Sequence, residues 1–131
     1  MIEIKNIYAG WLTFELHYGM VSQLFTVSYL NDFRDDINYL LGVGDEEYFY
    51  KYKNEMEIRA IILDGEGSIL KLSIMKNEFE DEAVITWWLN DDVPVVMVFD
   101  YHKLVNDWTK EMDKHKDIYD REYLIDYDDE E

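Results

Sequence analysis

Cysteine is absent from the 131 residues, so the chain has no disulfide bond and no thiolate metal site. It has one proline and six glycines, and no stretch rich in either divides it. No apolar run approaches the roughly 20 residues of a membrane-spanning helix, and the first 14 residues lack the pattern of a secretory signal. We therefore expect a soluble, cytoplasmic protein with residues 1–125 as one domain.

Positive charge is scarce: 12 basic residues stand against 30 acidic ones, for a net charge of −18. The net charge grows along the chain, from −3 over residues 1–40 to −6 over residues 101–131. A field of this sign repels phosphate backbones and anionic lipids, which argues against direct binding to nucleic acid or membrane. It favours capture of a basic protein. The alternative is that the acidity serves only solubility.

Apolar periodicity predicts an α+β fold with two helices on one side of antiparallel strands, a two-layer arrangement in the order β-β-α-β-β-β-β-α. The first helix follows a cap at Asn31 or Asp32 and ends at Gly42, and the second follows Asp100. A further strand near residue 50 is optional. Alternation and turn residues place the strands at residues 11–17, 22–30, 57–63, 69–75, 83–89 and 95–99.

Some strand faces can be assigned from the alternation. Leu70, Leu72 and Ile74 should point inward, and residues 57–63 share an Ile58-Ala60-Ile62 face. The turn Asp64-Gly65-Glu66-Gly67 should use glycine for positive φ. Of the four tryptophans, Trp11 and Trp108 are expected in the core. Neighbouring Trp87 and Trp88 must point to opposite faces of their strand, which we expect helices to cover on both sides.

Residues for catalysis or metal binding do not converge in the sequence. His102 and His115 lie about 20 Å apart along one predicted helix, so they cannot share a metal. His17 alternates with Glu15 on a strand and could touch it. No serine stands in a G-x-S-x-G turn, and thirty acids make any carboxylate pair uninformative. We expect no enzyme activity, no cofactor and no metal.

Acidic residues beside aromatic ones are the best candidates for contact with a basic partner. Aromatic side chains dominate binding hot spots, and an acidic rim suits a basic target. Trp88 is the candidate anchor if it is exposed, although an exposed tryptophan could equally mark a homodimer. The predicted partner-binding residues are Asp45, Glu46, Glu47, Tyr48, Tyr50, Glu78, Glu80, Asp81, Glu82 and Trp88.

Half of the chain resembles a known class of protein. The stretch from Gly10-Trp11 through a hairpin to Ser28-Tyr29-Leu30-Asn31-Asp32, followed by a short helix, resembles small bacterial immunity proteins encoded beside polymorphic toxins, and so does the strand pair from Glu57 to Met75. The resemblance implies a cytoplasmic, non-catalytic α+β domain that binds and blocks a toxin without a cofactor.

The leading hypothesis is therefore an immunity protein that neutralises a basic, nuclease-like toxin by charge steering and aromatic anchors. A second hypothesis is a DNA mimic whose carboxylates imitate phosphates along a regular stripe. A third is an enzyme with paired carboxylates, which requires a deep pocket and a carboxyl group of raised pKa. A fourth is a soluble domain of other function. Residues 126–131 should form a frayed acidic tail.

Overall fold

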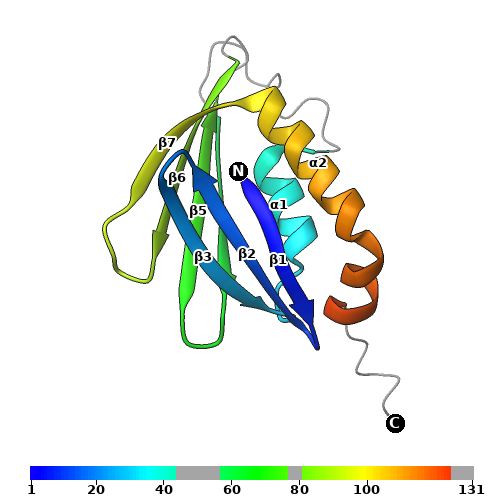
Figure 1. The fold of residues 1–131 in the computed structure, drawn as a ribbon. Coiled ribbons are helices and arrows are strands. Elements are labelled where there is room, and N and C mark those ends of the chain that lie inside the picture. The colour runs from blue at the N-terminus through cyan, green and yellow to red at the C-terminus, as the bar shows by residue number, and fades with distance from the viewer. Residues whose placement is uncertain (44–56, 77–80, 125–131) are drawn as a thin grey trace.

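The computed structural model describes residues 1–43, 57–76 and 81–124, and these confirm the α+β class (Figure 1). Two antiparallel sheets and two helices follow one another in the order β-β-β-α-β-β-β-β-α. The elements are β1 (Ile2–Tyr8), β2 (Trp11–Tyr18), β3 (Val21–Ser28), α1 (Phe33–Leu41), β4 (Glu57–Asp64), β5 (Ile69–Lys76), β6 (Glu82–Leu89), β7 (Val95–Asp100), α2 (Tyr101–Ile118) and a short π-helical turn, η1 (Tyr119–Tyr123).

The strands form two sheets, with orders β1-β2-β3 and β4-β5-β6-β7. The first strand, β1, was not predicted. Its pairing with β2 shifts register between Ile4 and Asn6, so Ile7 rather than Asn6 turns towards the core. That irregularity interrupts the alternation of Ile2 and Ile4, which is the signal on which a strand prediction depends.

Both helices begin directly after residues that were predicted as their N-caps, Asp32 and Asp100. The Asp32 carboxylate accepts a hydrogen bond from the Asp35 amide, and Gly42 ends α1 in the left-handed conformation with φ of 72°. The Asp100 carboxylate caps α2 by accepting from the Lys103 amide. No helix among the described residues is long and apolar enough to cross a bilayer.

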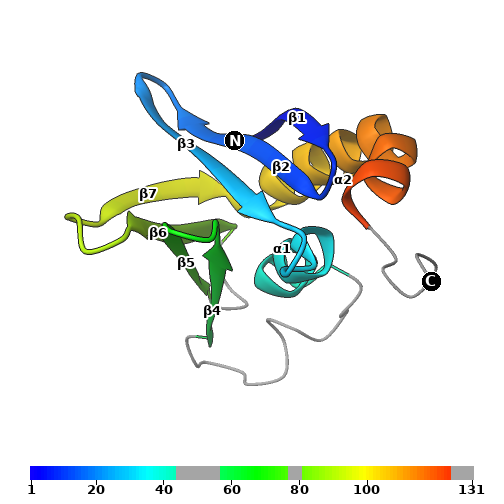
Figure 2. The same ribbon diagram turned by 90° about the horizontal axis from the view of Figure 1, so that it is seen from below.

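One hydrophobic core lies between the two sheets and the helices. Figure 2 shows the β1–β3 sheet on one side of the β4–β7 sheet, with α1 beside β4 and α2 beside β1. The Trp108 ring of α2 meets the Phe33 ring of α1 edge-on, and its indole nitrogen donates to the Asn38 side chain at 2.7 Å. Trp108 is buried as predicted. Trp11 was predicted in the core and is exposed, because it lies on the solvent side of β2.

Hydrogen bonds join η1, the turn that follows α2, to the start of α1. The Tyr123 hydroxyl lies 2.6 Å from the carbonyl oxygens of both Ser28 and Asn31. The Tyr119 hydroxyl donates to the Asp32 carboxylate and accepts from the Arg34 amide. Burial raises the pKa of both tyrosine hydroxyls, so each remains a neutral donor.

The β4–β5 turn lies where it was predicted, but its first glycine, Gly65, is not needed for a positive φ. Glu66 and Gly67 hold positive φ, and the Asp64 carboxylate accepts from the Glu66 amide at 2.7 Å. A methyl group at Gly65 would come within 2.6 Å of the Thr26 carbonyl oxygen on β3. Gly65 is therefore required for close approach of the turn to β3.

Candidate protein-binding face

The β4–β7 sheet has one face in the core and one face open to solvent. Leu70, Leu72 and Ile74 of β5 point into the core as predicted. On β4 the core residues are Ile61 and Leu63, so the Ile58-Ala60-Ile62 face points away from the core. We call the solvent side the outer face. Its residues, with polar ones included, are Ile58, Ala60, Ile62, Ile69, Lys71, Ser73, Met75, Val84, Thr86, Trp88, Val96 and Val98.

Strand register aligns the side chains of the outer face in rows that cross the sheet. One row is apolar across all four strands: Ile58, Met75, Val84 and Val98. The next row contains Ala60, Ser73, Thr86 and Val96. In the third row, Ile62 and Trp88 flank Lys71. Lys71 is the one charged side chain among these described rows.

The aliphatic side chains of the outer face are exposed on the edge strands β4 and β7, while Met75, Val84 and Trp88 on the central strands are half-buried. Ile58 is 64% exposed, Ile62 59%, Val96 57% and Val98 47%. The expectation that helices cover both faces of β6 is therefore wrong, because neither α1 nor α2 lies over this side of the sheet (Figure 2). Single exposed apolar residues are ordinary on proteins, but contiguous rows of them mark interaction surfaces.

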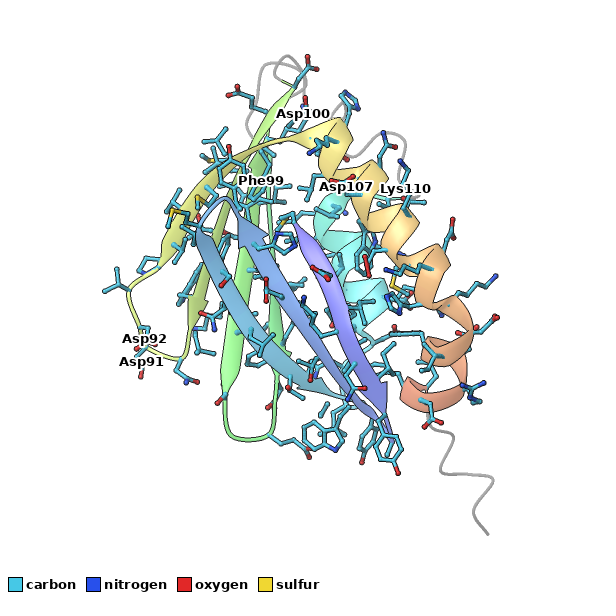
Figure 3. All side chains as sticks on the ribbon, in the orientation of Figure 1. Asp91, Asp92, Phe99, Asp100, Asp107 and Lys110 are labelled. Atoms are coloured by element: carbon cyan, nitrogen blue, oxygen red, sulfur yellow. The ribbon has the colours of Figure 1, made fainter. Side chains whose placement is uncertain are left out.

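Carboxylates bound the outer face at both ends of its strands. Glu82 of β6 and Asp100 of β7 are register partners at one end. At the other end, Asp64 closes β4, and the β6–β7 hairpin carries Asp91 and Asp92, which Figure 3 shows at the tip. All five residues are exposed. The face thus has an apolar centre between two acidic ends, an arrangement that suits a partner with an apolar centre and a basic rim.

The predicted partner-binding residues only partly meet on this face. Asp81 and Glu82 are exposed where β6 begins, and Asp81 lies 3.7 Å from the His102 imidazole. Trp88 is half-buried on the outer face, six residues from Glu82 and therefore about 20 Å away along the strand. The other predicted residues lie outside the described ranges: Asp45, Glu46, Glu47, Tyr48, Tyr50, Glu78 and Glu80.

The aliphatic side chains of the outer face are candidate binding residues that were not predicted from the sequence. The sequence does contain a signal for them, because β4 and β7 are apolar at both odd and even positions. A strand apolar on both sides requires cover on both sides. Where the fold covers only one, the other remains available to a partner.

A pocket of about 480 Å³ opens where β7 meets α2. Tyr18 and Phe99, whose rings meet edge-on at 4.9 Å, form one wall, and Lys103 and Asp107 of α2 line another. Figure 3 shows Phe99, Asp100 and Asp107 around this junction.

Asp35 and Asp36, the two carboxyl groups with a raised pKa in the described part of the chain, do not line this pocket. The pKa of Asp35 is raised chiefly by its hydrogen bond with Asp32, and that of Asp36 chiefly by burial. Both belong to the first turn of α1, where the pocket does not reach. The geometry that the enzyme hypothesis requires is therefore not found at these two groups.

Histidine and carboxylate side chains in the described ranges form no cluster of three that could hold a metal ion. The sequence pattern allows His17 to touch Glu15; in the structure its imidazole lies 3.4 Å from the Glu3 carboxylate of the neighbouring strand β1. The pKa of Glu3 is lowered, chiefly by its hydrogen bond with Lys5. These contacts are surface ion pairs at the start of β1.

Comparisons of the chain with protein-family models, with curated protein sequences and with solved structures find no match.

Proposed function

We propose that this protein is a non-catalytic binding domain whose outer face docks on a basic protein, and that it serves as an immunity protein against a nuclease-like toxin in the cytoplasm. The observation that carries the proposal is the row of Ile58, Met75, Val84 and Val98, which is apolar across four strands and open between carboxylates. Burying exposed aliphatic side chains supplies about 25 cal/mol for each Å² removed from water.

Charge decides which kind of partner the face favours. A net charge of −18 accelerates encounter with a basic protein and penalises a second copy of the same chain. A nuclease domain has to carry a basic surface for its own phosphate substrate, so it matches this field. A DNA mimic would instead need carboxylates spaced across its binding face, where this sheet carries aliphatic rows.

The apolar centre and the acidic rim of the outer face should respond differently to salt. Carboxylates at the rim act mainly on the association rate, which falls as salt screens them. Apolar contacts at the centre act mainly on dissociation and persist in salt. We expect a complex whose association slows in high salt while its dissociation rate stays nearly constant.

The direct test pairs this chain with the basic protein encoded by the adjacent gene of the source genome. The double variant Ile62→Thr/Trp88→Thr removes two anchors from the outer face. The matched control, Tyr8→Thr/Trp11→Thr, removes two exposed aromatic side chains from the β1–β3 sheet. Loss of a hot-spot residue typically costs about 2 kcal/mol or more, roughly thirtyfold in affinity.

We expect the outer-face variant to lose at least roughly thirtyfold in affinity and to stop protecting cells from the toxic protein, while the control stays within about twofold. Circular dichroism and urea unfolding establish that both variants remain folded. Equal losses in the two variants, or none in either, contradict the proposed face. An adjacent product that neither binds nor is neutralised contradicts the immunity role.

A further inference from the structure

Strand β7 forms one edge of its sheet, and half of its backbone groups point away from β6. The Tyr101 amide donates to the Asp81 carbonyl at 2.7 Å, in line with the β6–β7 register. Antiparallel pairs alternate between bonded and non-bonded residues, so Phe99, Met97 and Val95 bond to β6. Val96 and Val98 therefore direct their N–H and C=O groups towards the free edge.

Two other sheet edges in the described structure are capped by side chains. On β1, the Ile4 amide donates to the Glu111 carboxylate and the Ala9 amide to the Glu122 carboxylate, both at 3.3 Å. On β4, the Asn31 side chain both accepts from the Asp64 amide and donates to the Asp64 carbonyl. No comparable cap on Val96 or Val98 occurs within residues 1–43, 57–76 and 81–124.

The middle of β7 carries no residue that blocks pairing, although Pro94 directly precedes the strand and Asp100 closes it. Edge strands usually carry a lysine, a proline or a bulge that discourages a further strand. Residues 95–99 read Val-Val-Met-Val-Phe, without a charge or a proline, and pair regularly with β6. The side chains of Val96 and Val98 are also exposed, so this edge continues directly into the outer face.

The pocket described above lies beside the C-terminal end of β7. Val98, Phe99 and Asp100 line the 480 Å³ pocket, together with Tyr18 and Gly19 of the β2–β3 turn. An added strand that runs along β7 can therefore place its last side chain in this pocket.

Both ends of β7 are acidic. Asp91 and Asp92 precede the strand and Asp100 closes it, as Figure 3 shows. A second copy paired antiparallel on β7 would bring Asp100 of each protomer towards Asp91 and Asp92 of the other. Like charges opposed in this way disfavour self-pairing and favour a strand with basic ends.

We propose that the free edge of β7 accepts an extended strand of the basic partner, apolar in its middle and basic at both ends, which adds to the sheet through the backbone of Val96 and Val98. The inference rests on the proposed function and deepens it, because the added strand continues the outer face beyond β7. Backbone pairing supplies affinity, and the flanking charges supply register and specificity.

The experiment uses the acetylated and amidated peptide Arg-Val-Thr-Val-Thr-Val-Arg with the intact chain labelled with ¹⁵N. We expect saturable shifts of the Val96 and Val98 amide signals and slower hydrogen exchange at both. A peptide N-methylated at its five central residues keeps its charges and side chains but cannot pair. It should bind at least roughly tenfold more weakly, as should the peptide with glutamate at both ends.

Two chain variants separate backbone from side chain. Val96→Pro removes an N–H that faces the free edge and leaves the bonds to β6 in place, as proline in edge strands allows. Val96→Ala keeps the N–H and shortens the side chain. We expect Val96→Pro to weaken the peptide at least roughly tenfold and Val96→Ala far less. If Val96→Pro unfolds, the N-methylated peptide still decides the question on the unaltered chain.

The inference is overturned by no binding at about 1 mM peptide, by equal binding of the N-methylated peptide, or by shifts confined to α2. Self-association that slows exchange at Val96 would make a second copy the occupant and would overturn it too. If the peptide does not pair with β7 but Ile62→Thr/Trp88→Thr loses partner binding, strand addition at the edge is rejected and the outer face remains the proposed binding site. If the peptide pairs but that variant binds the partner normally, the outer face is rejected instead.

Discussion

Trp87 and Trp88 are consecutive residues of β6 that serve opposite sides of the sheet. Trp87 is 1% exposed and lies opposite Leu72 in the core, whereas Trp88 lies opposite Lys71 on the outer face. The Trp87 indole nitrogen is buried without a hydrogen-bond partner, so its contribution is one of packing. Trp87 therefore packs in the core, while Trp88 lies on the face that we propose for partner binding.

The first prediction follows from this division. Trp87→Ala should lower the free energy of unfolding by about 3–5 kcal/mol, because it leaves a large cavity between the sheets. Trp88→Thr should lower it by about 1 kcal/mol or less. Urea unfolding followed by circular dichroism measures both. Trp87→Phe loses no hydrogen bond and keeps a large ring, so it should lower the free energy of unfolding less than Trp87→Ala does. Similar losses of unfolding free energy in Trp87→Ala and Trp88→Thr would contradict the assignment of faces.

The second prediction concerns the junction between η1 and α1. Tyr123→Phe removes the hydroxyl that approaches the carbonyl oxygens of Ser28 and Asn31 at 2.6 Å. The Ser28 carbonyl still accepts from the amide and the side chain of Asn31, but the Asn31 carbonyl loses the Tyr123 donor. A part-buried carbonyl without this donor should cost about 1–3 kcal/mol of unfolding free energy. Tyr8→Phe, on an exposed ring, is the matched control and should change little. An unchanged midpoint for Tyr123→Phe would show that this junction does not stabilise the fold.

The third prediction tests why glycine occupies position 65. Gly65→Ala sets a methyl group within 2.6 Å of the Thr26 carbonyl, so the turn has to move away from β3. We expect a loss of about 1–3 kcal/mol in thermal or urea unfolding. Glu66→Ala, at a neighbouring residue that already holds φ of 58° with a side chain, should stay within about 0.5 kcal/mol. Equal effects of the two variants would argue against a steric cause.

The fourth prediction is a pH dependence at the start of α1. Burial, followed by the charges of Asp32 and Asp35, raises the pKa of Asp36 in the folded protein above its ordinary value. A raised folded pKa means that Asp36 favours folding only when protonated, and that this contribution is lost as pH rises through the folded pKa. Asp36→Asn should therefore raise the melting temperature at pH 7.

That gain should disappear below the ordinary aspartate pKa of about 3.9, where the wild-type side chain is also neutral. Asp91→Asn, in the exposed β6–β7 hairpin, removes one negative charge far from α1 and is the matched control at each pH. A lower melting temperature for Asp36→Asn at pH 7 would mean that the favourable interaction of Asp36 with the helix dipole outweighs its burial.

Local signals in the sequence predicted much of this fold. Asp32, Gly42 and Asp100 mark helix ends because their chemistry satisfies free backbone groups within a few residues. The alternation of β5 assigns its core face for a similarly local reason. The bulge after Ile4 hid β1, since a single extra residue exchanges the two faces of a strand.

The candidate site was harder to predict than the fold. Burial of Ile58 or Val96 depends on whether a helix covers that side of the sheet, which is decided by packing between distant elements. Trp87 and Trp88 point to opposite faces as predicted, but the aliphatic residues of β4 and β7 join Trp88 on one face only through strand register. The acidic flanks at Asp81 and Glu82 are exposed as expected.

The most direct test of the central claim is a methyl NMR titration of the chain, labelled at its isoleucine methyl groups, with the basic protein encoded by the adjacent gene. Ile58 and Ile62 report on the outer face, Ile4 and Ile7 on the β1–β3 sheet, and Ile118 on α2. We predict saturable shifts at Ile58 and Ile62, with the other three signals nearly unmoved. Shifts at Ile118 or in the β1–β3 sheet, with Ile58 and Ile62 unchanged, would contradict the account.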